Sequence, residues 1–433
     1  MNQTPIKQDA RPDIAWQWGV DTDELETIQL RRLNRLLADA GQNAFYRDRL
    51  GPLKLPLESL DQLDELPLLV KSDLVADSPG QPGRLFTLPR QSYCRFHQTS
   101  GTSGHPMPVL DTAADWCWWL DCWQHVLHAA HVTPADVAMM AFSFGPFIGF
   151  WTASDALVRS GALMVPGGGM SSETRLQMIH DHRCTLVCCT PTYALHLLAV
   201  ADQMSINLRD STVTRLIVAG EPGGSQPAIR ARIEQGWGAT VIDHSGASEI
   251  GAWGFGSDDG RGLHVIETEF IAERLCFDDS HPTGRRAGDG EPAELVLTGL
   301  GRYGGPAIRY RTGDIVQGYR NHDHRCRFLY LDGGVLGRSD DMMVIRGVNV
   351  FPSSIESIVR QHDATAEFRM IVTKQGEMDT LAVEAELDPN RCAELAELFH
   401  TRLAMRVDVQ PVEIGSLPRF QAKSKRLVDR RSD

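Results

Sequence analysis

Short apolar runs alternate with stretches of helical periodicity between residues 137 and 242. The apolar runs are Val137–Phe142, Ala162–Val165, Thr185–Cys189, Leu216–Ala219 and Thr240–Ile242, and the helical stretches between them include Glu173–Asp181, Tyr193–Gln203 and Gln226–Gln235. A chain that returns through a helix after each strand places its strands parallel, and a parallel sheet is buried by helices on both faces. The alternation therefore predicts an α/β fold with a mainly parallel, helix-covered sheet.

The pattern differs on either side of this region. Upstream, a helix is predicted over residues 21–41, because Asp21 can cap it and leucines recur at helical spacing, and a second helix over 113–131. Near Gly284 the pattern changes to Gly, Pro and short β-like runs, which predict an antiparallel or barrel-like part. After Gly337 helical and strand-like stretches alternate again, as in a small α+β domain. We therefore expect an N-terminal domain over residues 1–339 and a C-terminal domain over residues 340–433.

Charge and hydropathy exclude several classes of function. The 433 residues carry 43 Lys+Arg against 56 Asp+Glu, a formal net charge of −13, and an acidic surface repels phosphate backbones and anionic lipid heads. No window approaches the ~18 uninterrupted apolar residues of a membrane-spanning helix, and the first thirty residues lack the parts of a signal peptide. The nine cysteines are an odd number and are scattered along the chain. We expect a cytoplasmic protein with reduced thiols that binds neither nucleic acid nor membranes.

A loop at residues 99–106 is dense in hydroxyl groups and glycines. Its members are Thr99, Ser100, Gly101, Thr102, Ser103, Gly104, His105 and Pro106. Glycines let the backbone approach an anion closely, and the N–H and O–H groups can donate to phosphate oxygens. The Gly-Lys-Ser/Thr of a P-loop is missing, so this is not a P-loop nucleotidase or kinase. Taken alone, the segment is equally typical of a surface linker.

Two carboxylates follow short strand-like runs. Glu249 ends the string Asp243-His244-Ser245-Gly246-Ala247-Ser248-Glu249, where it could hold Mg²⁺ through its oxygens. Asp314 ends Arg309-Tyr310-Arg311-Thr312-Gly313-Asp314, where it could accept two hydrogen bonds from a ribose diol. Either carboxylate could instead be an ordinary surface or turn residue that caps its own backbone.

Together with these strings, the run from Gly337 to Pro352 (GRSDDMMVIRGVNVFP) resembles the adenylate-forming enzymes, which include acyl- and aryl-CoA ligases, nonribosomal adenylation domains and firefly luciferase. The strings Arg311-Thr312-Gly313-Asp314 and Ala219-Gly220-Glu221-Pro222-Gly223-Gly224 are most similar to the phenylacetate-CoA ligase branch. The resemblance spans nearly the whole chain.

The resemblance implies a two-step reaction and a set of roles. A carboxylate attacks the α-phosphate of ATP to give an acyl-adenylate and pyrophosphate, and a thiol such as CoA then displaces AMP. The residues implied to bind the β- and γ-phosphates are Ser100, Gly101, Thr102, Ser103 and Gly104. The resemblance also implies Asp243 and His244 beside adenine, Glu249 on Mg²⁺, Asp314 on the ribose and Arg338 on the ribose or phosphates. Four further residues are implied in the nucleotide site: Gly220, Glu221, Pro222 and Ser248. Asp340 is implied as the hinge and Gly347 as part of the path for the CoA thiol.

The family also uses a C-terminal lysine that bridges the carboxylate and the α-phosphate. The string Phe420-Gln421-Ala422-Lys423-Ser424-Lys425 aligns best with Lys423 in this role, and Lys425 is its rival. A solvated basic tail is the plain alternative. A mobile domain that carries one essential lysine also makes chemical sense, because its charge can leave when the thiol arrives.

Aromatic residues predict an acyl pocket for a small planar acid. Its expected members are Phe142, Phe144, Phe147 and Trp151, together with Ala219, Gly220 and Ser245. By contrast, Trp116, Trp119 and Trp123 recur at helical spacing, which favours core packing. Some relatives hold a structural zinc near the position of His264. Here only His264, His322, His324 and Cys326 could contribute, and the usual paired-cysteine spacing is missing, so a zinc site is the less favoured alternative.

The sequence therefore predicts an AMP-forming aryl-CoA ligase that uses ATP, Mg²⁺, CoA and a small aromatic carboxylic acid. Departures from the family pattern, such as His105 at a frequent lysine position and His244 at a frequent tyrosine position, indicate a divergent member. Two alternatives stay open: an enzyme that passes its acyl group to a carrier-protein thiol or a nitrogen nucleophile, and a non-catalytic sensor of ATP or AMP. The sequence does not decide between a monomer and a homodimer.

Overall fold

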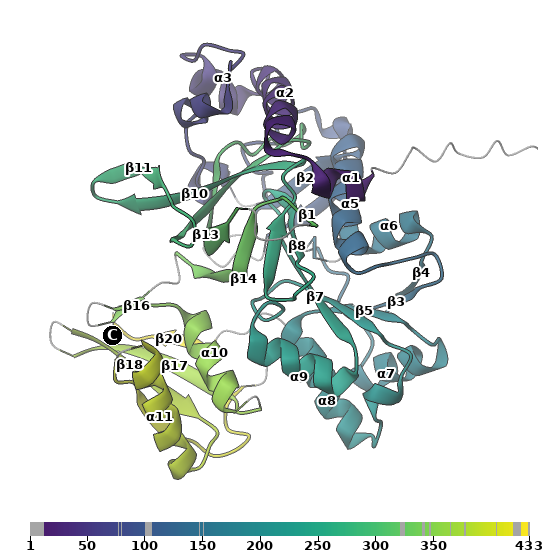
Figure 1. Cartoon of the computed structure of the whole chain (residues 1–433), viewed down its shortest axis with the longest axis vertical. Coiled ribbons are helices and arrows are strands. Elements are labelled where there is room, and N and C mark those ends of the chain that lie inside the picture. The colour runs from purple at the N-terminus through teal and green to yellow at the C-terminus, as the bar shows by residue number, and fades with distance from the viewer. Residues whose placement is uncertain are drawn as a thin grey trace, which may run out of the picture.

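The computed structural model describes residues 13–76, 78, 80–99, 106–146, 148–149, 151–320, 325–339, 343–345, 348–363, 365–375, 378–403, 405–418 and 426–431 (Figure 1). Several predicted site residues lie outside these ranges, namely Ser100, Gly101, Thr102, Ser103, Gly104, Phe147, Asp340, Gly347, Lys423 and Lys425.

A parallel sheet forms where the alternation predicts one. Its strands are β3 (Val137–Met140), β4 (Leu163–Pro166), β5 (Leu186–Cys189), β6 (Arg215–Val218) and β7 (Thr240–Ala247), and they pair in the order β7-β6-β5-β3-β4. The connecting helices are α6 (Trp151–Ser160), α7 (Ser172–Asp181), α8 (Pro191–Gln203) and α9 (Pro227–Trp237). Local signals set the helix ends: the Thr190 side chain accepts from the Tyr193 amide, and Gly238 ends α9 in the left-handed conformation. The α/β prediction is confirmed.

Seven antiparallel strands continue the same sheet instead of forming a separate barrel-like part. They are β8 (Gly251–Gly256), β9 (Gly262–Val265), β10 (Phe270–Asp278), β11 (His281–Arg286), β12 (Pro292–Gly299), β13 (Tyr310–Tyr319) and β14 (Tyr330–Arg338), and the complete sheet has twelve strands. The antiparallel part begins at the β7–β8 turn, not near Gly284 as predicted. Strand β7 also runs past Ile242, because His244 to Ala247 pair with β8.

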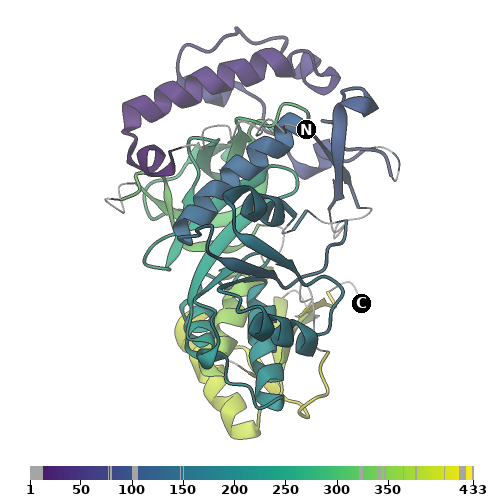
Figure 2. The ribbon, with the colours of Figure 1, turned by 90° about the vertical axis from the view of Figure 1, so that its right-hand side faces the viewer.

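The N-terminal region covers one side of the sheet. Its elements are α1 (Ile14–Gly19), α2 (Thr22–Ala40), α3 (Ala44–Leu50), η1 (Leu60–Glu65), α4 (Lys71–Leu74), η2 (Arg90–Ser92), the hairpin β1 (Tyr93–Gln98) and β2 (Pro108–Thr112), and α5 (Ala113–Ala129); η3 (Leu208–Asp210) follows α8. Figure 2 shows α2 lying across the end of the molecule opposite the C-terminal domain. The predicted helix at 21–41 is confirmed, with the Asp21 side chain accepting from the Glu24 amide. The tryptophans of α5 are buried, as expected for core packing.

Residues beyond β14 form a small α+β domain with its own core, which confirms that part of the fold prediction. Its elements are β15 (Met343–Ile345), β16 (Val348–Val350), α10 (Pro352–His362), β17 (Phe368–Gln375), β18 (Met378–Ala385), α11 (Pro389–Leu403), β19 (Asp408–Pro411) and β20 (Leu427–Asp429). Four of its strands pair in the order β19-β18-β17-β20. The domain packs through α10 against α9 and β14 (Figure 1).

Two further observations concern the predicted surroundings of the protein. In the part of the chain that the structure describes, no helix combines the length and the apolar character that a membrane crossing needs. None of the nine cysteines, all within the described residues, forms a disulfide, and Cys188 and Cys189 are buried in β5. Burial raises the pKa of the Cys188 thiol to about 12, so this group stays protonated and inert.

Candidate functional site

The carboxyl ends of the parallel strands gather most of the described site residues. In the sheet, β4 lies on one side of β3, whereas β5, the next strand in sequence, lies on the other side. The direction in which strands are added therefore reverses between β3 and β5. In α/β sheets, ligands bind at such a reversal, beyond the carboxyl ends of the strands. Phe142 follows β3, Gly220 follows β6, and Asp243 lies in β7. The structure thus brings the predicted acyl-binding and nucleotide-binding residues to one edge of the sheet.

Glu249 occupies the tight turn that joins β7 to β8. The Ile250 amide donates to the Ala247 carbonyl at 3.1 Å, which closes a β-turn with Glu249 as one of its two central residues. The Glu249 side chain is only 8% exposed, and the ammonium nitrogen of Lys71 lies 3.4 Å from its Oε1. A buried carboxylate already facing a cation is a hard oxygen ligand of the type that Mg²⁺ prefers. Glu249 therefore fits the predicted magnesium site.

Lys71 is a site residue that the sequence analysis missed. It begins the short helix α4 and is 37% exposed. The preceding residue but one, Leu69, pairs with the start of β13: its amide donates to the Arg309 carbonyl at 2.9 Å, and the Arg311 amide donates to its carbonyl at 2.8 Å. This pairing places Lys71 next to Glu249, although the two residues are more than 170 positions apart in the sequence. The nearby aliphatic run and Lys-Ser-Asp segment gave no local signal of a ligand.

The hairpin β1–β2 flanks the predicted phosphate loop. The Thr99 amide donates to the Met107 carbonyl at 3.0 Å, and the Met107 amide donates to the Thr99 hydroxyl at 3.1 Å. The Gln98 amide donates to the Pro146 carbonyl at 2.8 Å, which joins the hairpin to the segment after β3. The predicted loop at residues 99–106 is therefore flanked by strand on both sides. Antiparallel pairing holds both ends of the loop together beside the sheet edge.

The Gly220-Glu221-Pro222 string makes a turn after β6. Gly220 has φ = +93°, a left-handed conformation that favours glycine. The Glu221 carboxylate accepts from the Thr192 amide at 2.7 Å and from the Thr192 hydroxyl at 2.5 Å. Burial raises the pKa of Glu221, and these hydrogen bonds oppose the rise. Glu221 thus ties the turn after β6 to the first turn of α8, at the edge where the sequence predicts the nucleotide.

Asp243 and His244 take opposite faces of β7, because successive side chains of a strand alternate. Asp243 accepts from the Ser225 hydroxyl at 2.6 Å and from the His244 amide at 3.0 Å. His244 contacts the Gly254 carbonyl through Nδ1 at 2.7 Å, and its ring lies 4.3 Å from that of Trp123 on α5. The two side chains therefore do not face one common ligand. Burial raises the pKa of Asp243 to about 6 and lowers that of His244 to about 4.

Asp314 and Arg338 meet across two neighbouring strands. They are directly paired in the β13–β14 register, and Arg338 Nη1 donates to Asp314 Oδ1 at 3.0 Å and to the Thr312 carbonyl at 2.9 Å. Gly313, the residue before Asp314, has φ = +76°, and a Cβ there would approach the Arg338 guanidinium to 2.7 Å. The structure thus brings together two residues that the sequence assigned separately to the ribose side. Arg338 is 39% exposed and Asp314 is 16% exposed.

Aromatic side chains line the segment after β3. The rings of Phe142 and Phe144 lie 4.7 Å apart, and Phe144 meets Trp151 edge-on at 4.7 Å. The Trp151 indole donates to the Gly145 carbonyl at 2.9 Å, which fixes the ring at the start of α6. Gly168 has room for Phe144 only because it lacks a side chain, since a Cβ there would lie 2.8 Å from the ring. These half-buried rings form an apolar wall after β3, while the half-buried Ala219 follows β6 and the half-buried Ser245 lies in β7.

His264 belongs to an aromatic cluster. Its ring lies 5.5 Å from Phe255 and 5.4 Å from Tyr330, and Phe255 in turn stacks on Trp18 at 4.7 Å. Among the residues that the structure describes, no three His, Cys, Asp or Glu side chains are grouped as metal ligands. The neighbouring His322 and His324 lie outside the described ranges.

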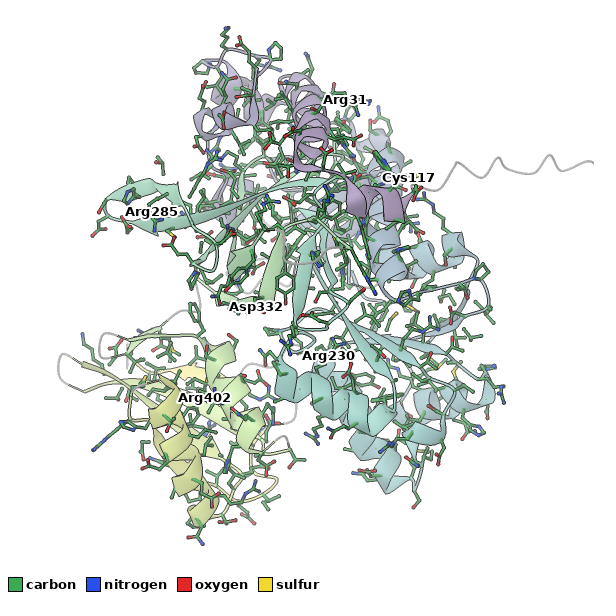
Figure 3. All side chains as sticks on the ribbon, in the orientation of Figure 1. Arg31, Cys117, Arg230, Arg285, Asp332 and Arg402 are labelled. Carbon is green, nitrogen blue, oxygen red and sulfur yellow. The ribbon has the colours of Figure 1, made fainter. Side chains whose placement is uncertain are left out.

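The C-terminal domain contacts the main sheet at β14, the strand that carries Arg338. The Ser353 hydroxyl donates to the Leu336 carbonyl of β14, and Gly337 packs so closely on Phe351 that a Cβ would lie 2.7 Å from the ring. Arg426 pairs with Glu356 at 3.0 Å and with Glu367 at 2.6 Å. Arg230, labelled in Figure 3, marks the part of α9 next to this domain. In this structure the small domain therefore contacts the main sheet at β14.

Comparisons with known proteins agree with this architecture. The family model described as AMP-binding enzyme matches residues 57–300, and the AMP-binding enzyme C-terminal domain matches residues 347–431. The phenylacetate-coenzyme A ligase of Escherichia coli (strain K12) is 31% identical over 429 residues, which are 95% of this chain and 96% of that enzyme.

Solved structures of a 2-hydroxyisobutyryl-CoA ligase match in two conformations. In the postadenylation state, in complex with 2-HIB-AMP, the TM-score is 0.88 at 26% identity, over 100% of this chain and 94% of that one. In the thioesterification state, in complex with 2-HIB-AMP and CoA, the TM-score is 0.71 at the same identity and coverage. Since the enzyme is the same in both comparisons, the difference lies in how its parts are arranged. The present structure has the arrangement closer to the postadenylation state.

Proposed function

This chain belongs to the AMP-binding enzyme family, and from that premise we propose that it activates a small aromatic carboxylic acid. It is an acid–thiol ligase that uses ATP, Mg²⁺ and CoA and passes through an acyl-adenylate. The observation that supports an aromatic acid is the wall of Phe142, Phe144 and Trp151 at the carboxyl edge. Aromatic rings pack well edge-on or offset against another ring, so this wall suits a planar acyl group.

The first step joins two anions. A carboxylate oxygen of the acid attacks the α-phosphorus of ATP, the bond to pyrophosphate breaks, and the acyl-adenylate forms. Positive charge and hydrogen-bond donors must therefore surround the phosphates. We assign the donors around the β- and γ-phosphates to residues 100–104 and the bridge between carboxylate and α-phosphate to Lys423. Bound Mg²⁺ would neutralise phosphate charge at Glu249, and Lys71 adds a second cation beside that carboxylate.

The nucleoside part of ATP is assigned to the neighbouring strands. Asp314 takes the ribose hydroxyls and Arg338 the ribose or phosphate side; their mutual ion pair keeps both groups oriented before ATP binds. The turn at residues 220–222 and Ser248 complete the site. Because Asp243 and His244 face opposite ways, adenine would meet the backbone of β7 and one of these side chains.

The second step needs a different arrangement of the two domains, which we place at residues 1–339 and 340–433. The CoA sulfur attacks the acyl carbon, the bond to the AMP oxygen breaks, and AMP leaves. Rotation about Asp340 would withdraw Lys423 and bring Gly347 to the thiol path. A lysine that leaves with its domain removes a charge that the thiol step does not use.

The proposal is tested by pyrophosphate release from ATP and Mg²⁺ over a panel of acids. The panel contains benzoic, phenylacetic, hydroxybenzoic, aminobenzoic, 2-hydroxyisobutyric and short fatty acids, each with and without CoA, and products are identified by mass. We expect an aryl acid to release pyrophosphate and to yield its acyl-CoA. A preference for 2-hydroxyisobutyric or fatty acids would overturn the aromatic assignment. Acyl-AMP that accumulates without reacting with CoA would instead indicate a carrier-protein or amine acceptor.

A further inference from the structure

Arg302 is a buried cation to which the assignments above give no role. It lies in the loop between β12 and β13 and is only 1% exposed. Its guanidinium lies 5.6 Å from the ring centre of Trp119 and 5.5 Å from that of Phe86. Burying a full positive charge is costly unless the charge is paired and hydrogen-bonded, so the partners of Arg302 indicate what it does.

The first partner is Asp111, which lies on β2 just beyond the predicted phosphate loop. Arg302 Nη2 lies 2.8 Å from Asp111 Oδ1, and both side chains are inaccessible to solvent, at 1% and 0% exposure. The Trp119 indole donates to the same oxygen at 3.1 Å. Burial raises the pKa of Asp111, and the Arg302 charge opposes that rise. The pair thus fixes the guanidinium relative to the strand that leaves the phosphate loop.

The second set of partners is the turn that carries Glu249. Arg302 Nη1 donates to the Ser248 carbonyl at 2.8 Å and to the Glu249 carbonyl at 3.2 Å. These carbonyls belong to the two central residues of a β-turn, which have no hydrogen-bond partner within the turn itself. They also belong to the two peptide planes on either side of the Glu249 Cα. A donor that holds both planes therefore sets the direction in which the Glu249 side chain leaves the backbone.

The loop between β12 and β13, which carries Arg302, is itself hydrogen-bonded to α5. Asp115 Oδ1 accepts from the Tyr303 amide at 2.8 Å and from the Gly304 amide at 3.1 Å, while Asp115 Oδ2 accepts from the Thr112 amide at 2.9 Å. A Cβ at Gly301 or Gly304 would overlap Trp118 or Asp115. Arg302 therefore extends from a loop that has little freedom to adjust.

We propose that Arg302 is a positioning residue for the magnesium carboxylate. Through Asp111 on one side and the Ser248 and Glu249 carbonyls on the other, it keeps the strand after the phosphate loop at a fixed distance from the Glu249 turn. The two parts of the site that bind the triphosphate and its cation are thereby held in register before ATP arrives. The inference rests on the proposed role of Glu249 and adds to it the residue that aims this side chain.

The test measures nucleotide binding rather than turnover. The affinity for an ATP analogue with a methylene bridge between the α- and β-phosphates is determined by calorimetry, once with Mg²⁺ and once with EDTA. The variant is Arg302→Met, and the matched control is Arg215→Met. Arg215 likewise pairs with a buried aspartate, Asp136, and donates to two successive carbonyls, those of Ala130 at 3.0 Å and His131 at 2.8 Å. It begins β6, at the end of the sheet opposite the site.

We expect Mg²⁺ to tighten binding of the analogue in the wild type and in Arg215→Met. In Arg302→Met, the affinity for the analogue should fall about tenfold when Mg²⁺ is present and change little in EDTA. Asp111→Asn, which keeps the volume of the side chain and weakens the ion pair, should change binding in the same direction. Arg302→Lys keeps the charge and serves if Arg302→Met does not fold; one ammonium group cannot hold Asp111 and both carbonyls, so part of the Mg²⁺ effect is lost.

Two results would count against these assignments in different ways. An Arg302→Met or Arg302→Lys protein with the full Mg²⁺ effect of the wild type would overturn the positioning role and leave the role of Glu249 intact. A wild type that binds the analogue equally well with Mg²⁺ and with EDTA would overturn the magnesium assignment of Glu249 itself, and the inference with it.

Discussion

The ammonium nitrogen of Lys71 lies 3.4 Å from Oε1 of Glu249, although the two residues belong to a short N-terminal helix and to a hairpin turn in the middle of the main sheet. Glu249 is nearly buried and Lys71 is partly open to solvent, so the pair presents a cation at the rim of the site. In the proposed site, a triphosphate would meet this cation together with the carboxylate assigned to its metal ion. This relationship leads to the first prediction.

Lys71→Met should raise the KM for MgATP about tenfold and leave the KM for the acid unchanged, because a charge-assisted contact to phosphate is lost while the acyl wall is untouched. Steady-state pyrophosphate release measures both constants. Lys54→Met is the control: Lys54 pairs with the exposed Glu58 at 3.0 Å, and its loss should change neither constant. Equal rises of both KM values in Lys71→Met would contradict a specific contact with the nucleotide.

Phe144→Ala should lower kcat/KM for aryl acids about tenfold to a hundredfold and affect short aliphatic acids much less. The substitution removes the ring that contacts both Phe142 and Trp151 and so opens the apolar wall. The measurement is pyrophosphate release with paired aryl and aliphatic acids. Phe96→Ala, at a ring that is 54% exposed, is the matched control. A uniform loss over all acids would mean that Phe144 supports the fold and does not select the substrate.

Asp243 should make the protein less stable as the pH rises from about 4 to about 6. Burial raises the pKa of its carboxyl to about 6 in the folded protein, so the protonated form is favoured by folding and its stabilisation is lost as pH rises through that value. Between pH 5 and 7.5 the wild type should lose about 1 kcal/mol of unfolding free energy relative to Asp243→Asn. Urea unfolding at both pH values measures this difference. A difference that does not depend on pH would contradict the raised pKa.

His125 should make the protein less stable as the pH falls below about 6.5. The Trp18 indole donates to His125 Nδ1 at 3.0 Å, and burial lowers the pKa of the ring to about 3. The neutral ring is favoured by folding, so its contribution is present above about pH 6.5 and is lost as pH falls. From pH 7.5 to pH 5 the wild type should lose about 2 kcal/mol relative to His125→Asn. His400→Asn, at an exposed position of α11, should show no such change.

Lys423→Ala should abolish adenylation, by about a hundredfold or more, while thioester formation from supplied acyl-adenylate and CoA survives. The bridging charge is needed only while carboxylate and α-phosphate are joined. Lys425→Ala serves as the control, and it should leave both half-reactions close to those of the wild type. If Lys425→Ala shows the split instead, the catalytic lysine is Lys425; loss of both half-reactions in Lys423→Ala would contradict the assignment.

The alternation of strand and helix could be predicted because its signals are local. Each apolar run and each helical period lies within about ten residues, and caps such as Thr190 and Gly238 stand at the element ends. The continuation of β7 from His244 to Ala247 could not be predicted, because small and polar residues are poor strand formers and pairing with β8 keeps them extended. The same pairing places the antiparallel strands in the main sheet.

Contacts between distant segments set the limit for the site. The sequence indicated Glu249, Asp314 and Arg338 individually, and the last two prove to be bonded neighbours. It gave no sign of Lys71 or Arg302, because each reaches Glu249 only through tertiary structure. The opposite directions of Asp243 and His244, in contrast, follow from strand alternation alone once both residues are assigned to one strand.

The continuous twelve-stranded sheet has a consequence for how the protein can come apart. Strand β7 pairs with a parallel neighbour through its first half and with an antiparallel neighbour through its second half, so neither half of the sheet ends at a natural edge there. A fragment cut between β7 and β8 would expose two long rows of unpaired backbone groups. Residues 13–338 should therefore melt as one cooperative unit, and a split version of the enzyme should tolerate a break far better beyond β14 than within the sheet.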